Sequence, residues 1–268
     1  MMNVQPEIWW RKWNWIILRT VVPCSVGMLS GVLAMGGPDT PWIAVPIAGL
    51  TVAFFLATAL LYRVPRCDSS AMSTMCWLRW QSVTLGIAMV ASAVCYAAHR
   101  LSSGRDEVLA SGVTGAFAGL AAIFAGNLSD LRIKDLARQG YALMILPWLA
   151  TFELGVLSGW LLVYGPTVAK VGAAHQRVLS AVILTVVLEL LVLLRGYIMP
   201  RPSYMSRSLN MRGAKQTFAS LFGLRAWGGS LVPTLLLVLT MTNEGIWFAA
   251  LAWLILLLGH MAWYYMLM

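Results

Sequence analysis

Apolar positions fill this chain in eight long stretches, and most charged positions lie on the connections between them. Each stretch has about 20 residues, which as a helix spans the roughly 30 Å hydrocarbon core of a bilayer. Backbone groups in hydrocarbon must satisfy their own hydrogen bonds, so the pattern predicts an all-α integral membrane protein, a bundle of eight transmembrane helices. The expected spans are 16–36, 42–62, 80–98, 108–127, 141–164, 177–198, 226–243 and 246–267.

The positive charges lie mainly on alternate connections. Fifteen of the 19 lysines and arginines lie at the N-terminus, on the even-numbered connections or beside them, and the exceptions are Arg100, Arg105, Lys170 and Arg177. Because loops rich in lysine and arginine remain on the cytoplasmic side, both termini and the long 199–222 connection are expected in the cytoplasm.

The composition leaves little room for anything except membrane spans. Of 268 residues, 60% are hydrophobic and 11% are charged. Eight spans use roughly 160 residues, and the remainder forms short connections. We therefore expect a single polytopic membrane domain over residues 1–268, in contact with the lipid bilayer and without a nucleic-acid partner.

The residue types that hold metal cofactors are sparse. The four cysteines form no C-x-x-C pair, so an iron–sulfur cluster in this chain is not expected. No two of the three histidines are spaced as a pair on one helix, which argues against a haem. Catalytic motifs such as G-x-S-x-G and H-E-x-x-H are also lacking, so we expect neither a catalytic residue nor a metal site.

Two acidic residues and one histidine lie inside the predicted spans. A buried ionisable group in a membrane is costly, so His260 is expected to face a cavity or a partner. For Glu153, a proton relay and a helix–helix hydrogen bond are both open interpretations. For Glu189 we favour the hydrogen bond.

Small residues recur at four-residue spacing in the fourth stretch. Gly112, Gly115, Gly119 and Gly126 lie among alanines there. Such spacing lets helix backbones approach closely. We expect the contacts to be internal to the bundle rather than a dimer interface.

Several short motifs then follow one another along most of the chain. They are Trp15–Ile16–Ile17 with Pro23–Cys24 and Gly27, Leu60–Leu61–Tyr62–Arg63 with Pro65–Arg66, Cys76–Trp77–Leu78–Arg79–Trp80–Gln81, Leu224–Arg225, and Gly259–His260 with Tyr264–Tyr265. In order and spacing the chain resembles the membrane anchor subunit of dimethyl sulfoxide reductase-type molybdoenzymes.

This resemblance implies a non-catalytic subunit of a respiratory complex in the bacterial cytoplasmic (inner) membrane. Such anchors bind menaquinol and pass its electrons to an iron–sulfur subunit, which supplies a molybdopterin catalytic subunit. The residues that the resemblance assigns to quinone binding or partner docking are Tyr62, Arg66, Trp77, Leu78, Gln81, Arg225 and His260, with Glu153 as a candidate proton relay.

The chain departs from the family pattern at three ionisable positions. Leu61 or Tyr62 replaces a histidine, Gln81 replaces a glutamate, and His260 replaces another glutamate. A glutamine can form hydrogen bonds but takes up no proton at neutral pH. Either another group such as His260 or Glu153 accepts the quinol proton, or quinol oxidation has weakened.

The charge pattern leaves two interpretations of how the soluble subunits dock. Either these subunits are cytoplasmic, or the basic face attracts an acidic partner and the topology follows other signals. We favour the first.

Two other functions also fit the sequence. A transporter component is suggested by Glu153, Glu189 and prolines within or near the spans, at Pro23, Pro46, Pro147 and Pro233. A scaffold subunit without quinol oxidation fits the lost ionisable residues.

Overall fold

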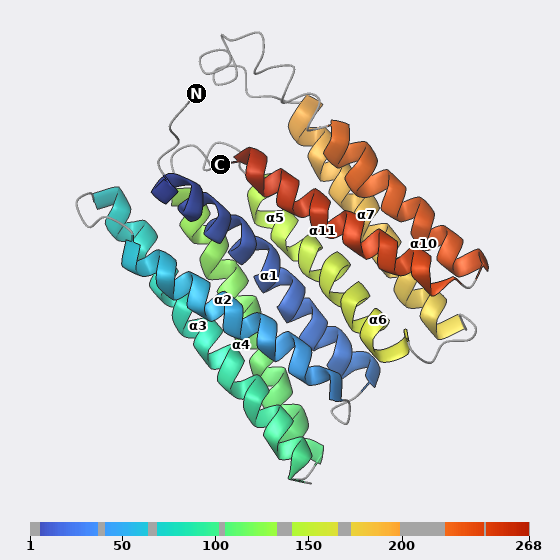
Figure 1. Ribbon diagram of the computed structural model, residues 1–268, viewed down its shortest axis with the longest axis horizontal. Coiled ribbons are helices and arrows are strands. Elements are labelled where there is room, and N and C mark those ends of the chain that lie inside the picture. Colours follow the sequence, from blue (N-terminus) through green and yellow to red (C-terminus); the bar gives the residue numbers. More distant parts are fainter. Residues whose placement is uncertain are drawn as a thin grey trace. The chain divides into compact units, whose positions relative to one another are not determined.

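The computed structural model describes residues 6–36, 41–63, 69–101, 105–132, 141–165, 173–198, 223–243 and 245–267. Almost all of these residues are helical, which confirms the all-α prediction (Figure 1). The helices match the apolar stretches, because a run of apolar residues can bury its backbone in lipid only as a helix.

Seven helices in the described ranges are long and apolar enough to cross a membrane. They run over Trp13–Met35, Ala44–Tyr62, Cys76–Arg100, Asp106–Leu128, Ile145–Tyr164, His175–Leu194 and Ile246–Tyr264. The chain is therefore a multi-pass membrane protein by length and composition.

The predicted span 226–243 is not among these seven. Its segment consists of a π-helix, η4 (Leu224–Leu231), which continues into an α-helix, α10 (Val232–Asn243). The η4 half includes Arg225, two glycines and Ser230, which make it less apolar than the other spans.

The helices group into two compact units, Met1–Val168 and Ala169–Met268. The expectation of one polytopic domain stays a prediction, and each unit is described here separately.

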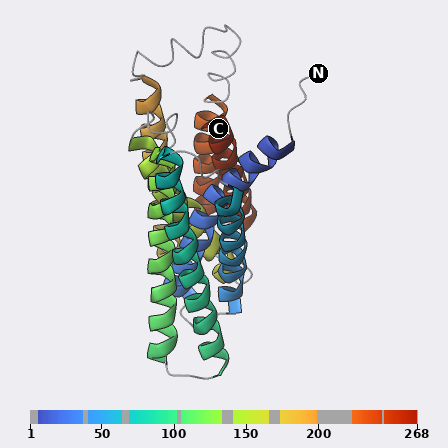
Figure 2. The ribbon, with the colours of Figure 1, turned by 90° about the vertical axis from the view of Figure 1, so that its left-hand side faces the viewer.

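In the first unit, α1 (Pro6–Gly36) is the central helix. It contacts α2 (Ala44–Arg63), α4 (Arg105–Arg132) and the broken helix formed by α5 (Tyr141–Ala150), η3 (Thr151–Val156) and α6 (Leu157–Tyr164). A short 3₁₀ turn, η1 (Pro41–Ile43), precedes α2. α3 (Ser69–Arg100) and α4 lie side by side as a long hairpin in both views (Figures 1 and 2).

Glycines allow α1 to approach the broken helix closely. Gly27 and Gly31 of α1 lie against Gly155 and Gly159, so two G-x-x-x-G motifs face each other. A Cβ atom on Gly155 would lie only 2.7 Å from the backbone nitrogen of Met28. Close backbone contact of this kind is the main source of helix association where no hydrophobic effect operates.

The glycine stripe of the fourth stretch packs inside the same unit, as predicted. A Cβ on Gly112 or Gly119 would contact α1, at Leu33 and Val26 respectively, and one on Gly115 would contact Ser92 of α3. The stripe therefore holds α4 between α1 and α3.

The second unit consists of α7 (Ala173–Ile198), the η4–α10 helix and α11 (Ile246–Leu267). The η4–α10 helix packs against both α7 and α11. In this unit the buried ionisable residues Glu189, Arg225 and His260 form one of the two clusters described next.

Candidate functional site

Two buried polar clusters occur within the described spans, one in each unit. The first contains Arg19 of α1 and Gln81 of α3, and the second contains Glu189, Arg225 and His260. All five side chains are at most 4% exposed. Burial of charged groups at membrane depth is expensive and usually marks function, so these clusters are the candidate sites.

In the first cluster, the Arg19 guanidinium bridges three helices. Nη1 donates a hydrogen bond of 3.2 Å to Gln81 Oε1, and Nη2 donates one of 2.9 Å to the backbone oxygen of Gly126 on α4. The guanidinium carbon also lies 5.5 Å from the ring centroid of Trp15, a cation–π distance. Residue 126 must be a glycine, because a Cβ atom there would overlap the Arg19 guanidinium and would lie 2.7 Å from Gln81 Nε2.

A small cavity adjoins this cluster. Its volume is about 10 Å³, close to the space that one water or one oxygen-sized group requires. Its polar lining comes from Arg19, Gln81 and Asn127. The Nε2 amide of Gln81 is buried and has no hydrogen-bond partner among the described residues. The cavity is therefore lined by donors suited to an oxygen acceptor. The other lining residues are Leu18, Val22, Pro23, Ile123 and Pro147.

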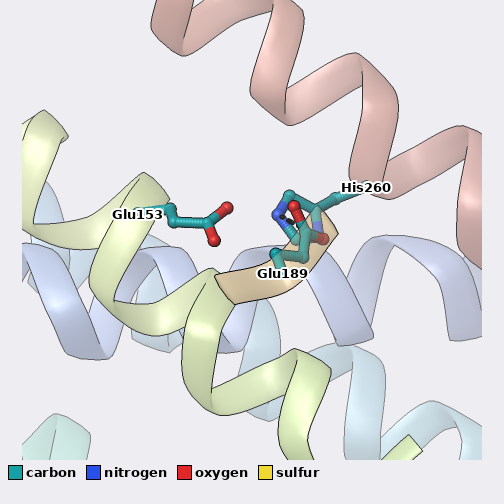
Figure 3. A group of neighbouring side chains, drawn as sticks. All are labelled: Glu153, Glu189 and His260. Carbon is teal, nitrogen blue, oxygen red and sulfur yellow. Dashed lines mark ion pairs between the residues drawn. The ribbon is translucent and has the colours of Figure 1, made fainter. Parts of the chain in front are cut away.

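In the second cluster, Arg225 is the centre of the polar contacts. Its Nη2 donates to Oε1 of the Glu189 carboxylate, and its Nη1 donates to the backbone oxygen of Gly229 at 2.8 Å. The Nε2 of His260 lies 3.4 Å from Arg225 Nη2 and 3.7 Å from Glu189 Oε1. Figure 3 shows the imidazole and the carboxylate turned toward each other from α11 and α7.

The local backbone explains why Arg225 can occupy this position. In a π-helix the i→i+5 pattern widens the turn and displaces carbonyl groups from their α-helical partners. The carbonyl oxygen of Gly229 accepts from the Arg225 guanidinium one turn earlier, and its α-helical partner four residues later would be Pro233, which has no backbone N–H. A Cβ on Gly259 of α11 would lie 2.9 Å from Arg225 Nη1 and 3.1 Å from the Gly229 Cα. Glycines at 229 and 259 therefore make the space for the guanidinium.

The other described π-helical segment, η3, also carries a buried ionisable residue. Glu153 of the first unit, labelled in Figure 3, is 0% exposed. η3 follows Pro147, which has no backbone N–H, and the hydroxyl of Thr151 donates to the Pro147 carbonyl at 2.7 Å. Short π-helical segments occur frequently at functional sites.

The structure separates the predicted site residues into different environments. Trp77, Leu78 and Gln81 follow one another on α3, where Trp77 is half-buried and the other two are buried. Tyr62, at the end of α2, is 84% exposed and so faces the surroundings of the chain. Arg66 lies outside the described residues.

Two of the residues that the resemblance assigns to one site are neighbours in the structure. Arg225 and His260, assigned to one site by the resemblance, do lie together. The hydrogen-bonding interpretation of Glu189 is confirmed by its contact with Arg225. Arg19 was missed as a site residue, although an arginine inside an apolar stretch was the signal that could have identified it.

No protein-family model, curated protein or solved structure shows a significant match to this chain. The site geometry and the sequence motifs are therefore the basis for a function.

Proposed function

We propose that this protein is the quinol-binding membrane anchor of a molybdopterin oxidoreductase complex. The observation that carries the proposal is the cavity beside Arg19, lined by the buried Gln81 amide. A quinone offers carbonyl oxygens and a quinol offers hydroxyl oxygens, and both accept hydrogen bonds from such donors.

The size of the cavity limits how the headgroup binds. Because the volume suits one oxygen-sized group, one headgroup oxygen enters and the ring lies at the mouth. Leu18, Val22 and Ile123 supply apolar lining near the ring. Small-molecule sites commonly combine such apolar walls with a few placed donors.

The depth of this site supports a role beside a docking face. Gln81 lies five residues after the start of the span Cys76–Arg100, and Asn127 lies one residue before the end of Asp106–Leu128. Both ends lead into connections rich in arginine and lysine. A quinol bound there is near the basic face, where we place the iron–sulfur subunit that passes electrons to the molybdopterin subunit.

The same proposal includes eight spans, with both termini on the cytoplasmic side of a bacterial inner membrane. η4 has 8 residues and α10 has 12, and together they form an uninterrupted helix over residues 224–243. At 1.5 Å per residue this helix is about 30 Å long, enough to cross the hydrocarbon core. The hydrogen bond from Arg225 to Gly229 within it lowers the cost of the charge near one end.

Quinone retention by a Gln81 variant tests the proposal. The purified chain in lipid nanodiscs is expected to retain quinone, measured by extraction and mass spectrometry. Gln81→Leu removes the amide donor and is expected to lower quinone affinity about tenfold, the size of one hydrogen bond of roughly 1.4 kcal/mol. Gln81→Glu is expected to lower quinone affinity as well, because an ionised carboxylate accepts hydrogen bonds and cannot donate one to a quinone oxygen.

Thr84→Val is the matched control on the same helix. Its hydroxyl donates only to carbonyls of α3, at 2.8 Å to Trp80, among its described contacts, so quinone binding should not change. Equal quinone content in Gln81→Leu and wild-type protein, or no quinone in wild-type protein, would overturn the site. The latter result would favour the scaffold alternative.

A transporter component is the second candidate, favoured by the buried Glu153 in the π-helical break after Pro147. Discontinuous helices with buried carboxylates are typical of substrate and ion sites in transporters. Proton-driven uptake into vesicles that Glu153→Gln abolishes, without bound quinone, would support this function over the first.

A further inference from the structure

We propose that Glu189, Arg225 and His260 form a proton-binding site in which the imidazole of His260 reversibly takes up one proton. This site lies in the second unit and is distinct from the quinone cavity. The inference goes beyond the proposed function and does not depend on quinone binding at Gln81.

The ion pair between Glu189 and Arg225 needs no third ionisable group. The Arg225 guanidinium already donates to the Glu189 carboxylate and to the Gly229 carbonyl. These contacts balance its charge within the unit. An imidazole 3.4 Å from the guanidinium and 3.7 Å from the carboxylate therefore adds a proton-accepting group beyond what a structural pair requires.

A proton on the His260 imidazole would change the contacts that its Nε2 atom can make. In neutral His260, Nε2 can accept from the Arg225 N–H group. When the ring is cationic, both nitrogens are donors, and the charged ring has the Glu189 carboxylate as an ion-pair partner 3.7 Å away. One proton is added to the ring and no other bond is formed or broken. The same two neighbours thus provide a partner for each protonation state.

The charges that face His260 within the unit have opposite effects. Glu189 of α7 favours the cationic ring, and Arg225 of η4 disfavours it. α10 carries no ionisable side chain. On α11 the neighbouring ionisable group is the phenol of the buried Tyr264, one turn later. Glu189 is therefore the residue in this unit whose charge favours the cationic form of His260.

Close glycine contacts between η4 and α11 hold the site in place. Gly229 and Gly259 bring η4 and α11 to backbone contact around the guanidinium. A preorganised site keeps its geometry when the proton arrives or leaves, so protonation costs little rearrangement. A loosely packed pair would instead move apart.

The test is solid-state nitrogen NMR of protein labelled with ¹⁵N-histidine in lipid bilayers. The chain has three histidines, and His260→Asn assigns the signal of His260 by its loss. We expect that signal to change from cationic to neutral as the pH is raised in steps from about 3 to about 9, a range wider than the one in which an unperturbed histidine titrates. His175→Asn, at the start of a candidate span, is the matched control and should leave the transition unchanged.

Glu189→Gln separates a proton site from a structural contact. Loss of the carboxylate should lower the ratio of cationic to neutral His260 about tenfold at a given pH, in the direction set by loss of an opposite charge. Because this substitution leaves Arg225 without a counter-charge in the unit, Glu189→Asp serves as the second variant and should preserve the titration. Helical circular dichroism verifies that both variants fold.

Two results would overturn the proposal. One is a His260 ring that keeps a single protonation state over the whole pH range in wild-type protein. The other is a titration that Glu189→Gln leaves unchanged. Neither measurement involves quinone, so loss of quinone binding at Gln81 would leave this site intact, and the reverse also holds.

Discussion

Nη1 of Arg225 donates a hydrogen bond of 2.8 Å to the backbone oxygen of Gly229, one turn later in the same π-helical segment. The side chain thereby satisfies a buried carbonyl whose α-helical partner position is Pro233, a residue without a backbone N–H. The packing around this contact leaves no space for a side chain at residue 229.

Gly229→Ala is expected to destabilise the protein, whereas Gly228→Ala is not. A Cβ at residue 229 would lie 2.5 Å from Arg225 Nη1, and overpacking of this kind costs about 1–3 kcal/mol. A Cβ at residue 228 would have no atom within 4 Å among the described neighbours, so alanine there should gain up to about 1 kcal/mol of helix propensity. Thermal unfolding in detergent compares the two; equal melting temperatures would show that the contact is not tight.

Arg225→Met is expected to destabilise the protein more than the double substitution Arg225→Met with Glu189→Met. The single change leaves the buried Glu189 carboxylate without its cationic partner, at a cost of about 3–5 kcal/mol. The double change removes both charges and lets apolar side chains pack, so much of the stability should return. A double-mutant cycle on unfolding free energies measures the difference. Additive effects would mean that the two side chains are not coupled.

The sequence predicts the positions of the helices far better than the side-chain contacts between them. The length of each apolar stretch is enough to identify a span, because each helix must by itself be long and apolar enough to cross the bilayer. Which buried polar groups meet depends on helix rotation and tilt, which a single sequence does not specify. Gln81 was therefore predicted as a site residue without its partner Arg19, which contacts it from 62 positions away.

The broken helices show a second limit. Pro147 and the Gly228–Gly229 pair indicate interruptions, but they do not indicate that the interruption is π-helical. The G-x-x-x-G motifs that begin at Gly27 and Gly155 are present in the sequence, but the sequence alone does not show that the two helices meet there. Their importance appears only when the two motifs are seen to face each other.

Gly27→Ala is expected to weaken the packing of α1 against η3. Its Cβ would lie 2.8 Å from the Gly155 Cα, a backbone atom that cannot move aside without shifting a helix. Gly86→Ala is the control, since its nearest neighbour is the Phe54 ring edge at 3.3 Å, the end of a side chain that can rotate. Unfolding in a denaturing detergent should show a loss of about 1–3 kcal/mol for Gly27→Ala and a smaller change for Gly86→Ala. Similar losses in both variants would argue against tight helix contact at Gly27.

Thiol labelling of Cys76 is expected to report the orientation of the chain. Cys76 is exposed at the start of a candidate span, while Cys24 and Cys95 are buried. Cys95 Sγ also contacts the Val108 carbonyl at 3.2 Å. In a Cys67→Ser background, a membrane-impermeant maleimide should therefore react in native protein with Cys76 and should reach the two buried thiols only after denaturation.

The charge distribution determines which side of the membrane this label must come from. The connection that contains Arg63, Arg66 and Arg79 belongs to the basic side, so Cys76 is expected in the cytoplasm. Inverted membrane vesicles should be labelled and intact spheroplasts should not, with Cys76→Ser removing the signal in both. Labelling of intact spheroplasts would place the basic face outside. Under the proposed function, the iron–sulfur partner would then dock from that side, and the cavity beside Gln81 would open toward it.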